Sequence, residues 1–112
     1  MSSSDCLFCK IAAAELPADV VYRDDAVTIF RDIHPQAPTH LLIIPNRHVA
    51  SASQVADPQV FASLFSAATA IAQDHALRDY RLVINNGAGA GQSVFHLHVH
   101  LLSGRALQWP PG

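Results

Sequence analysis

Three histidines stand at alternate positions near the carboxyl end of the chain. They are His96, His98 and His100, in the run His-Leu-His-Val-His-Leu-Leu. Alternate side chains of a strand point to the same side, so the three imidazoles are expected on one face and the apolar residues between them in the core. Three imidazoles can bind a transition metal. An imidazole, partly unprotonated near neutral pH, can instead attack phosphorus and form a covalent intermediate. A third interpretation is a polar surface that uses histidine by chance.

The segment before these histidines favours nucleophilic chemistry on a phosphate. Residues 86–91 alternate small residues with glycine, and glycine lets backbone N–H groups approach an anion closely. Asn85 precedes the segment, and Gln92 and Ser93 follow it with further polar side chains. The order of these residues predicts a phosphate-binding loop directly before the histidines.

The two cysteines, Cys6 and Cys9, are three positions apart. This is the ligand spacing of half a zinc site. In a reducing compartment the spacing favours a metal or redox role over a structural disulfide. A redox pair is disfavoured because no thioredoxin-like strand–helix–strand pattern surrounds it. The remaining alternative is a pair of inert thiols that pack the N-terminal helix.

Composition excludes several classes of protein. The chain has 112 residues, 50% hydrophobic and 14% charged, which predicts a single domain over residues 1–112 rather than a disordered segment. The net charge is −2, and without a basic stripe no nucleic-acid partner is expected. No apolar run reaches the roughly 20 residues that span a bilayer. Residues 1–5 lack the basic and apolar parts of a signal peptide, so a cytoplasmic location is expected.

The hydrophobic pattern predicts the elements that must position these residues. Asp57 and Pro58 form a helix start, and apolar residues then recur at helical spacing to about Leu77. We expect a short helix over 6–14, the long helix over 57–77, and strands over 20–22, 26–30, 40–45, 80–85 and 93–102. Short connections between consecutive strands predict antiparallel pairing. The fold class is therefore α+β, with about five antiparallel strands and one main helix on a face.

The motifs together resemble one known family. Gly91-Gln92-Ser93-Val94-Phe95 followed by the alternating histidines resembles the histidine-triad (HIT) superfamily. The segment 32–40, then Ile44-Pro45 and His48, and the Trp-Pro-Pro-Gly ending are similar to its Hint branch. The resemblance covers about residues 5–112. It implies the HIT fold, a five-stranded antiparallel sheet whose two copies join as a homodimer with one ten-stranded sheet.

The resemblance also implies a reaction. His98 is similar to the nucleophile that attacks the α-phosphate of a purine nucleoside 5′-phosphoramidate, forming a nucleotidyl-histidine that water then hydrolyses. His100 and the backbone of residues 93–95 would bind the phosphate, with help from the Ser93 hydroxyl. His40 would support them from a buried position. Backbone N–H groups and imidazoles can stabilise such a phosphoryl centre without a metal, so no cofactor is required for the chemistry.

The substrate pocket and a metal site follow from the same resemblance. Asp32 would accept hydrogen bonds from the ribose, and apolar walls would surround the purine. The expected nucleotide site comprises Phe8, Ile11, Phe30, Asp32, Ile33, Leu42, Asn85, Gly91, Gln92, Ser93, Val94, His98 and His100. From the residues alone, without the resemblance, Phe8, Ile11, Phe30 and Leu42 would be assigned to the core. A structural zinc is expected on Cys6, Cys9, His48 and His96.

Two further functions remain open at this point. One is hydrolysis of dinucleoside polyphosphates, and the other is a nucleotide- or zinc-binding regulatory module with little turnover. The shortness of the chain and its Trp-Pro-Pro-Gly ending favour the phosphoramidate hydrolase. His34 and His75 are assigned no role.

Overall fold

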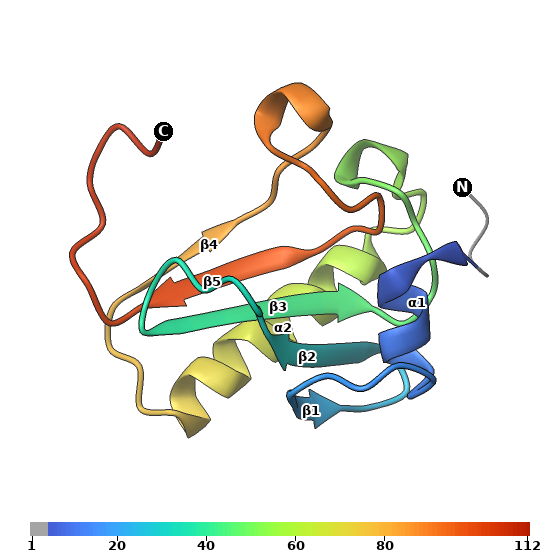
Figure 1. Cartoon of the computed structure of the whole chain (residues 1–112), viewed down its shortest axis with the longest axis horizontal. Helices are drawn as coiled ribbons and strands as arrows, with labels where there is room; N and C mark the ends of the chain where they lie inside the picture. The colour runs from blue at the N-terminus through green and yellow to red at the C-terminus, as the bar shows by residue number, and fades with distance from the viewer. Residues whose placement is uncertain (1–4) are drawn as a thin grey trace.

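A computed structural model describes residues 5–112. Residues 1–4, which belong to the segment that was expected not to be a signal peptide, lie outside the described residues. Figure 1 shows one sheet with helices on its two sides. The elements are α1 (Leu7–Ala12), β1 (Val20–Arg23), β2 (Val27–Arg31), β3 (Thr39–Pro45), the 3-10 turn η2 (Ala52–Gln54), α2 (Gln59–Asp74), β4 (Tyr80–Val83), the 3-10 turn η3 (Ala88–Ala90) and β5 (Val99–Ser103). No helix among residues 5–112 is long and apolar enough to cross a membrane.

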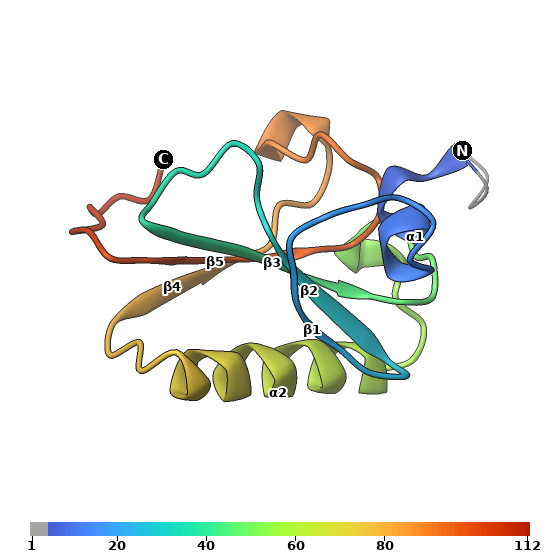
Figure 2. The same ribbon diagram turned by 60° about the horizontal axis from the view of Figure 1, so that its bottom comes forward.

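The five strands form one sheet in the order β1-β2-β3-β5-β4, and every neighbouring pair is antiparallel. The expected α+β class, the hairpin of β1 with β2, and the single main helix are thereby confirmed. Figure 2 shows α2 along one face of the sheet, while α1 and the loop over residues 32–38 lie on the other. The two faces therefore have different neighbours.

Alternation along β3 divides its residues between these two faces. Leu41 and Ile43 are fully buried against α2, together with apolar residues of β2 and β5. Leu42 and Ile44 lie in a second buried cluster on the opposite face, with Cys6, Phe8, Ile11 and Phe30. Because side chains alternate in a strand, His40 shares the face of Leu42. The helix α2 stabilises one side of the sheet, and the other side is left for α1 and the histidines.

The helix boundaries follow local hydrogen bonds. The helix α2 begins at Gln59, two residues after the expected start, and its N-cap residue is Pro58 rather than Asp57. Asp57 Oδ1 still accepts a hydrogen bond from Gln59 N at 2.9 Å. The helix α2 ends at Asp74, three residues before the expected end, because Ala76 has a φ of 54°. The helix α1 is shorter than the predicted 6–14, and Cys6 caps it by accepting a hydrogen bond from Cys9 N.

The predicted strands over 80–85 and 93–102 are too long. β4 ends at Val83, and β5 starts only at Val99. Residues before β5 do not join the sheet because their groups bond elsewhere: Leu97 N donates to Val49 O at 2.8 Å. The predicted alternation still holds, since Leu97 lies in the α2-side core while His96 and His98 contact Phe8 of α1.

Candidate active site

A cleft of about 410 Å³ opens on the face of the sheet that carries α1. Its floor is a row across three strands, in which Phe30 pairs with Leu42 and Leu42 pairs with His100. Ten of the thirteen expected nucleotide-binding residues line it: Phe8, Ile11, Phe30, Asp32, Ile33, Leu42, Ser93, Val94, His98 and His100. The local pattern and the topology thus bring together residues that are far apart in the sequence.

His98 is oriented by one hydrogen bond to the backbone. Its Nδ1 donates to the carbonyl oxygen of His96 at 2.7 Å, because a carbonyl can only accept. The neutral ring then carries its lone pair on Nε2, which has no hydrogen-bond partner among residues 5–112. Burial lowers the pKa of His98, which favours this neutral form. The neutral ring therefore keeps the lone pair of Nε2 free of a hydrogen bond to the described residues.

His40 and His100 form a hydrogen-bonded pair with a defined direction. Gln36 N donates to Nδ1 of His40 at 3.0 Å, so His40 carries its proton on Nε2. His40 Nε2 lies 2.9 Å from Nδ1 of His100 and donates to it. His100 consequently holds its own proton on Nε2, the nitrogen left for the cleft. The backbone amide of Gln36 therefore determines, through His40, that His100 presents the N–H of its Nε2 to the cleft.

His100 presents an N–H group rather than a positive charge in the free protein. Burial, followed by the nearby His98 and His40, lowers the pKa of His100 to about 4. Burial likewise lowers the pKa of His40, against the opposing attraction of Asp32. The structure gives a neutral hydrogen-bond donor at pH 7.

Asp32 faces both the cleft and the histidine pair. Its Oδ1 accepts a hydrogen bond from His34 N at 2.8 Å, which holds the start of the 32–38 loop. Its Oδ2 lies 3.4 Å from His40 Nε2. Asp32 is also one of the residues that line the cleft.

Three expected site residues are not among the residues that line the cleft: Asn85, Gly91 and Gln92. The buried side-chain amide of Gln92 is fully used within the protein. Its Oε1 accepts from Gly87 N at 2.8 Å, and its Nε2 donates to Ala50 O at 2.7 Å and to Val94 O at 3.1 Å. With both donor hydrogens bonded, Gln92 fixes the glycine-rich segment and has no free donor for a phosphate.

The glycine-rich segment also depends on Gly91. This residue has a φ of 102°, in the left-handed region that favours glycine. A β-carbon there would lie 3.5 Å from Nδ2 of Asn85, so the Asn85 side chain packs directly against the turn. Ser93, the next polar residue after Gln92, is exposed and lines the cleft.

Six further residues line the cleft and were not predicted from the sequence: Leu7, Leu16, Pro17, Ala18, Arg31 and His34. The segment 16–18 connects α1 to the edge strand β1 and borders the same cleft as Phe8 and Ile11.

The four expected metal ligands converge beside the cleft. Cys9 Sγ lies 3.3 Å from Nδ1 of His48 and 3.4 Å from Nδ1 of His96, and Cys6 Sγ lies 3.3 Å from the same His96 atom. All four ligand atoms lie within 4.8 Å of one another. A tetrahedral zinc with ordinary Zn–S and Zn–N bonds separates sulfur from nitrogen by about 3.5 Å. The donor set therefore fits zinc in type and spacing.

The orientation of His96 supports the same conclusion. Its Nε2 donates to Pro45 O at 2.8 Å, which leaves the lone pair of Nδ1 pointing at the sulfurs. Ligating histidines typically use their second ring nitrogen in this way. His96 thus belongs to the cysteine cluster, while His98 and His100 belong to the cleft.

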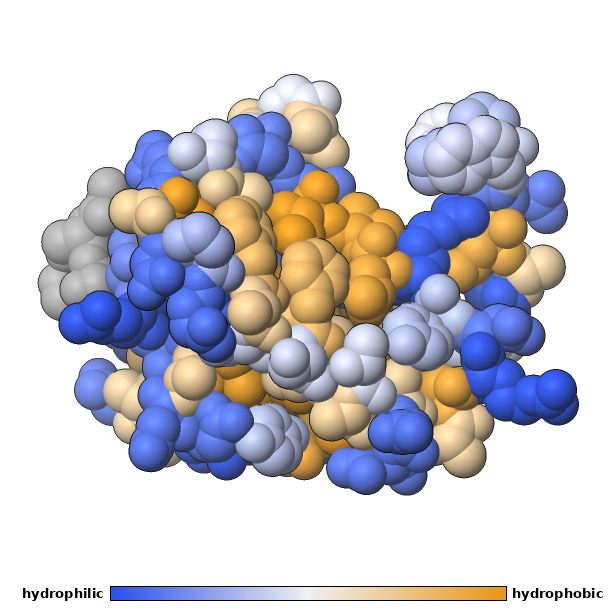
Figure 3. All heavy atoms as spheres, turned by 180° about the vertical axis from the view of Figure 1, so that it is seen from behind, coloured by the Kyte–Doolittle hydropathy of each residue, from blue (hydrophilic) through white to orange (hydrophobic). Residues whose placement is uncertain are grey.

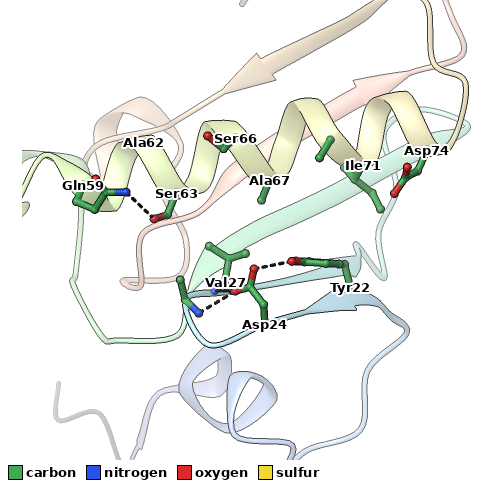
Figure 4. A pocket seen from close by; sticks show the side chains of 12 residues that line it. Tyr22, Asp24, Val27, Gln59, Ala62, Ser63, Ser66, Ala67, Ile71 and Asp74 are labelled. Carbon is green, nitrogen blue, oxygen red and sulfur yellow. Dashed lines mark hydrogen bonds between the residues drawn. The ribbon is translucent and has the colours of Figure 1, made fainter.

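A separate cavity of about 340 Å³ lies between the β1–β2 hairpin and α2. Figure 4 shows small side chains of α2 along it, facing Tyr22 and Asp24. The Tyr22 hydroxyl donates to Asp24 Oδ2, and Asp24 Oδ1 accepts from the backbone of Ala26 and Val27. These polar groups satisfy one another, and no histidine or cysteine lines the cavity. The reactive groups lie on the opposite face.

Comparison with known proteins identifies the same fold. Residues 13–107 match the HIT domain family. An uncharacterised HIT-like protein of Synechococcus elongatus is 46% identical over 113 residues, which cover 98% of this chain and 99% of that protein. The crystal structure of a HIT family hydrolase from Legionella pneumophila Philadelphia 1 superposes with a TM-score of 0.92 at 51% identity, covering 96% of this chain and 100% of that one. A Zn-bound histidine triad family protein from Mycobacterium smegmatis has a TM-score of 0.83 at 28% identity, covering 99% and 82%.

Proposed function

Because this chain belongs to the HIT domain family, we propose that it is a nucleotide hydrolase of the Hint branch that cleaves the P–N bond of purine nucleoside 5′-phosphoramidates. The observation that carries the proposal is the bond from His98 Nδ1 to the His96 carbonyl. The His98 imidazole is buried and neutral, and this bond leaves Nε2 as the one nitrogen of that ring that can attack a substrate. A Legionella relative of the same fold bears the name hydrolase.

The reaction has two displacements at phosphorus. His98 Nε2 attacks the α-phosphorus, an N–P bond forms, and the amine leaves with the electron pair of the old P–N bond and takes up a proton. Water then attacks the same phosphorus and gives up a proton to solvent, the electron pair of the N–P bond returns to Nε2 of His98, and the nucleoside monophosphate is released. Splitting one displacement into two in this way is the general advantage of nucleophilic catalysis.

The other cleft residues stabilise the phosphate during both steps. His100 Nε2–H donates to a phosphate oxygen, and the Ser93 hydroxyl and the backbone of residues 93–95 supply further donors. His40 acts through His100 and does not touch the substrate. Preorganised donors of this kind replace the water that would otherwise solvate the charge.

The apolar part of the cleft accepts the purine. Phe8 and Phe30 lie edge-on with ring centroids 5.3 Å apart, and Ile11, Ile33 and Leu42 complete the walls. The Asp32 carboxylate, at the polar end, accepts hydrogen bonds from the ribose hydroxyls. A cleft of about 410 Å³ is within the size range of small-molecule sites.

We further propose a structural zinc on Cys6, Cys9, His48 and His96. The metal would tie α1 and the segment before β5 to the end of β3, and it takes no part in the reaction. Both cysteines are free thiols. Such a site needs reduced cysteines, which is consistent with a cytoplasmic location.

The protein is also proposed to form a homodimer with a continuous ten-stranded sheet. The edge strands available for such pairing are β1 and β4. Figure 3 shows hydrophobic side chains gathered in the middle of the face seen from behind Figure 1. On α2 the large apolar residue Phe65 is 37% exposed. Mass measurement in solution would test the dimer directly.

The proposed activity is tested by AMP release from adenosine 5′-phosphoramidate. The wild type should release AMP, His98→Ala should release none while still binding AMP, and the exposed control His75→Ala should match the wild type. Rapid turnover by His98→Ala would overturn the mechanism. If the wild type fails on this substrate but hydrolyses dinucleoside polyphosphates, the substrate assignment is wrong. Nucleotide binding without any turnover would indicate a regulatory module.

A further inference from the structure

The loop over residues 32–38 carries the backbone amide that fixes the tautomer of His40. Gln36 N donates to Nδ1 of His40 at 3.0 Å. The carbonyl oxygen of the same Gln36 accepts a hydrogen bond from Nε of Arg105 at 2.8 Å. Arg105 is exposed and lies 69 positions from Gln36 in the sequence. A surface arginine after β5 therefore binds the residue that donates to the buried His40.

The turn that carries Arg105 is packed closely against this loop. Ser103, the last residue of β5, pairs with Thr39 at the start of β3. Gly104 follows with a φ of 101°, and a β-carbon there would lie only 2.8 Å from Cβ of Pro38. Only glycine fits both the backbone conformation and the close approach. The chain thus turns directly from β5 onto the loop.

The tautomer of His40 decides what the cleft presents to a phosphate. With Gln36 N donating to Nδ1, His40 donates from Nε2, and His100 directs an N–H from its own Nε2 into the cleft. In the other tautomer of the pair, His100 would donate from Nδ1 to His40. His100 Nε2 would then carry a lone pair, which repels a phosphate oxygen. The hydrogen bond from Gln36 N to Nδ1 of His40 therefore selects the first of these two tautomers over the second.

We propose that Arg105 is a positioning residue: by binding the Gln36 carbonyl it keeps the Gln36 amide on His40 and so keeps an N–H of His100 directed at the phosphate. The catalytic consequence rests on the proposed function. The tautomer itself is a property of the protein without substrate. The arginine touches neither the cleft nor the substrate and acts only through the loop.

The tautomer is measured by the imidazole ¹⁵N shifts and ring ¹H–¹⁵N couplings of the whole, metal-loaded protein at pH 7. His40 signals are assigned by their loss in His40→Gln. The wild type should show His40 protonated at Nε2. Arg105→Ala should shift His40 toward a mixture of tautomers, and Arg105→Lys, which keeps one donor, should lie between the two. Gly104→Ala should act in the same direction by displacing Pro38, without altering the arginine.

The control is Arg78→Ala, which removes an exposed arginine from the same end of the sheet without touching the loop. It should leave the His40 signals unchanged. With adenosine 5′-phosphoramidate, Arg105→Ala should lower kcat about three- to tenfold, as expected for one lost charge-assisted hydrogen bond at the surface. KM should stay within about twofold, because the purine walls are untouched.

The proposal is overturned if His40 of the wild type is protonated at Nδ1. It is equally overturned if Arg105→Ala leaves the His40 tautomer unchanged, whatever the effect of Gly104→Ala. A wild type that releases no AMP would refute the proposed function alone, since the nitrogen shifts would still decide the role of Arg105.

Discussion

The ring of Phe8 lies edge-on to the imidazole of His98, with ring centroids 5.2 Å apart and planes at 85°. The centroid of the same ring lies 6.0 Å from that of His96. Phe8 also stands between Cys6 and Cys9 in the sequence. One turn of α1 therefore serves the wall of the cleft and the proposed metal centre together.

Removal of zinc should weaken both stability and substrate binding. Protein purified without chelator should contain about one zinc per chain by elemental analysis. A strong chelator should lower the melting temperature by about 5 °C or more, since a loss of about 1 kcal/mol shifts a domain of this size by that amount. KM should rise more than kcat falls, because Phe8 loses its support. Metal-free protein with an unchanged melting temperature in chelator would contradict the site.

Gly91→Ala and Gly89→Ala should differ in stability although both add one methyl group. Gly91 has a φ of 102°, whereas Gly89 has no positive φ, and a β-carbon added to Gly89 would meet no atom within 4 Å. A non-glycine residue in the left-handed region costs about 1–2 kcal/mol. Urea unfolding should therefore show that loss for Gly91→Ala and little change for Gly89→Ala. Equal stability of the two variants would mean that the turn is not constrained.

Gln92→Ala should destabilise the protein by about 2–4 kcal/mol, because it leaves an amide and two carbonyls without their partner. Gln92→Glu should do no better, since a carboxylate has no donor for the carbonyls of Ala50 and Val94. The exposed Gln73 of α2 gives the matched control, and Gln73→Ala should be nearly neutral. Thermal unfolding of the three variants checks this. A neutral Gln92→Ala would show that the amide does not hold the loop.

Acid should destabilise the protein in part through His100. Its pKa is lowered from 6.5 to about 4 in the folded state. Between these values the unfolded chain binds a proton that the folded chain does not, so stability falls as pH is lowered from about 6.5 to 4. One such group contributes at most about 1.4 kcal/mol per pH unit. His100→Gln should reduce this slope in denaturant titrations, whereas the exposed control His75→Gln should not. Parallel pH curves for wild type and His100→Gln would rule out a buried, neutral His100.

Local periodicity explains what could be predicted from the sequence. Alternation of His98 and His100 with apolar residues is a property of an extended chain, and it holds even where residues 93–98 leave the sheet. The strand itself was overpredicted because the competing bond, from Leu97 N to Val49 O, joins segments that are distant in the sequence. No local pattern contains that bond.

The contacts between distant histidines could not be predicted for the same reason. His40 pairs with Leu102 and Leu42 with His100 in the register of β3 and β5, so the two imidazoles meet diagonally. A single-residue change in register would separate them. Likewise, the three bonds of Gln92 depend on Ala50 and on the turn at Gly87, and its residue type alone favoured a donor to the phosphate.

Because the side chains of β3 are divided between two faces of the sheet, the protein cannot easily accept a change in the length of this strand. Leu41 and Ile43 pack on α2, while His40 and Leu42 lie on the opposite side of the sheet, where Leu42 lines the cleft. Substitutions among similar apolar residues at these positions leave each side chain on its own face of the sheet. Inserting or deleting one residue within the strand would instead turn every later side chain to the wrong side. Core residues would then enter the cleft, and cleft residues would enter the core. Natural length variation should therefore be confined to the loops at either end of β3, whatever the variation in its composition.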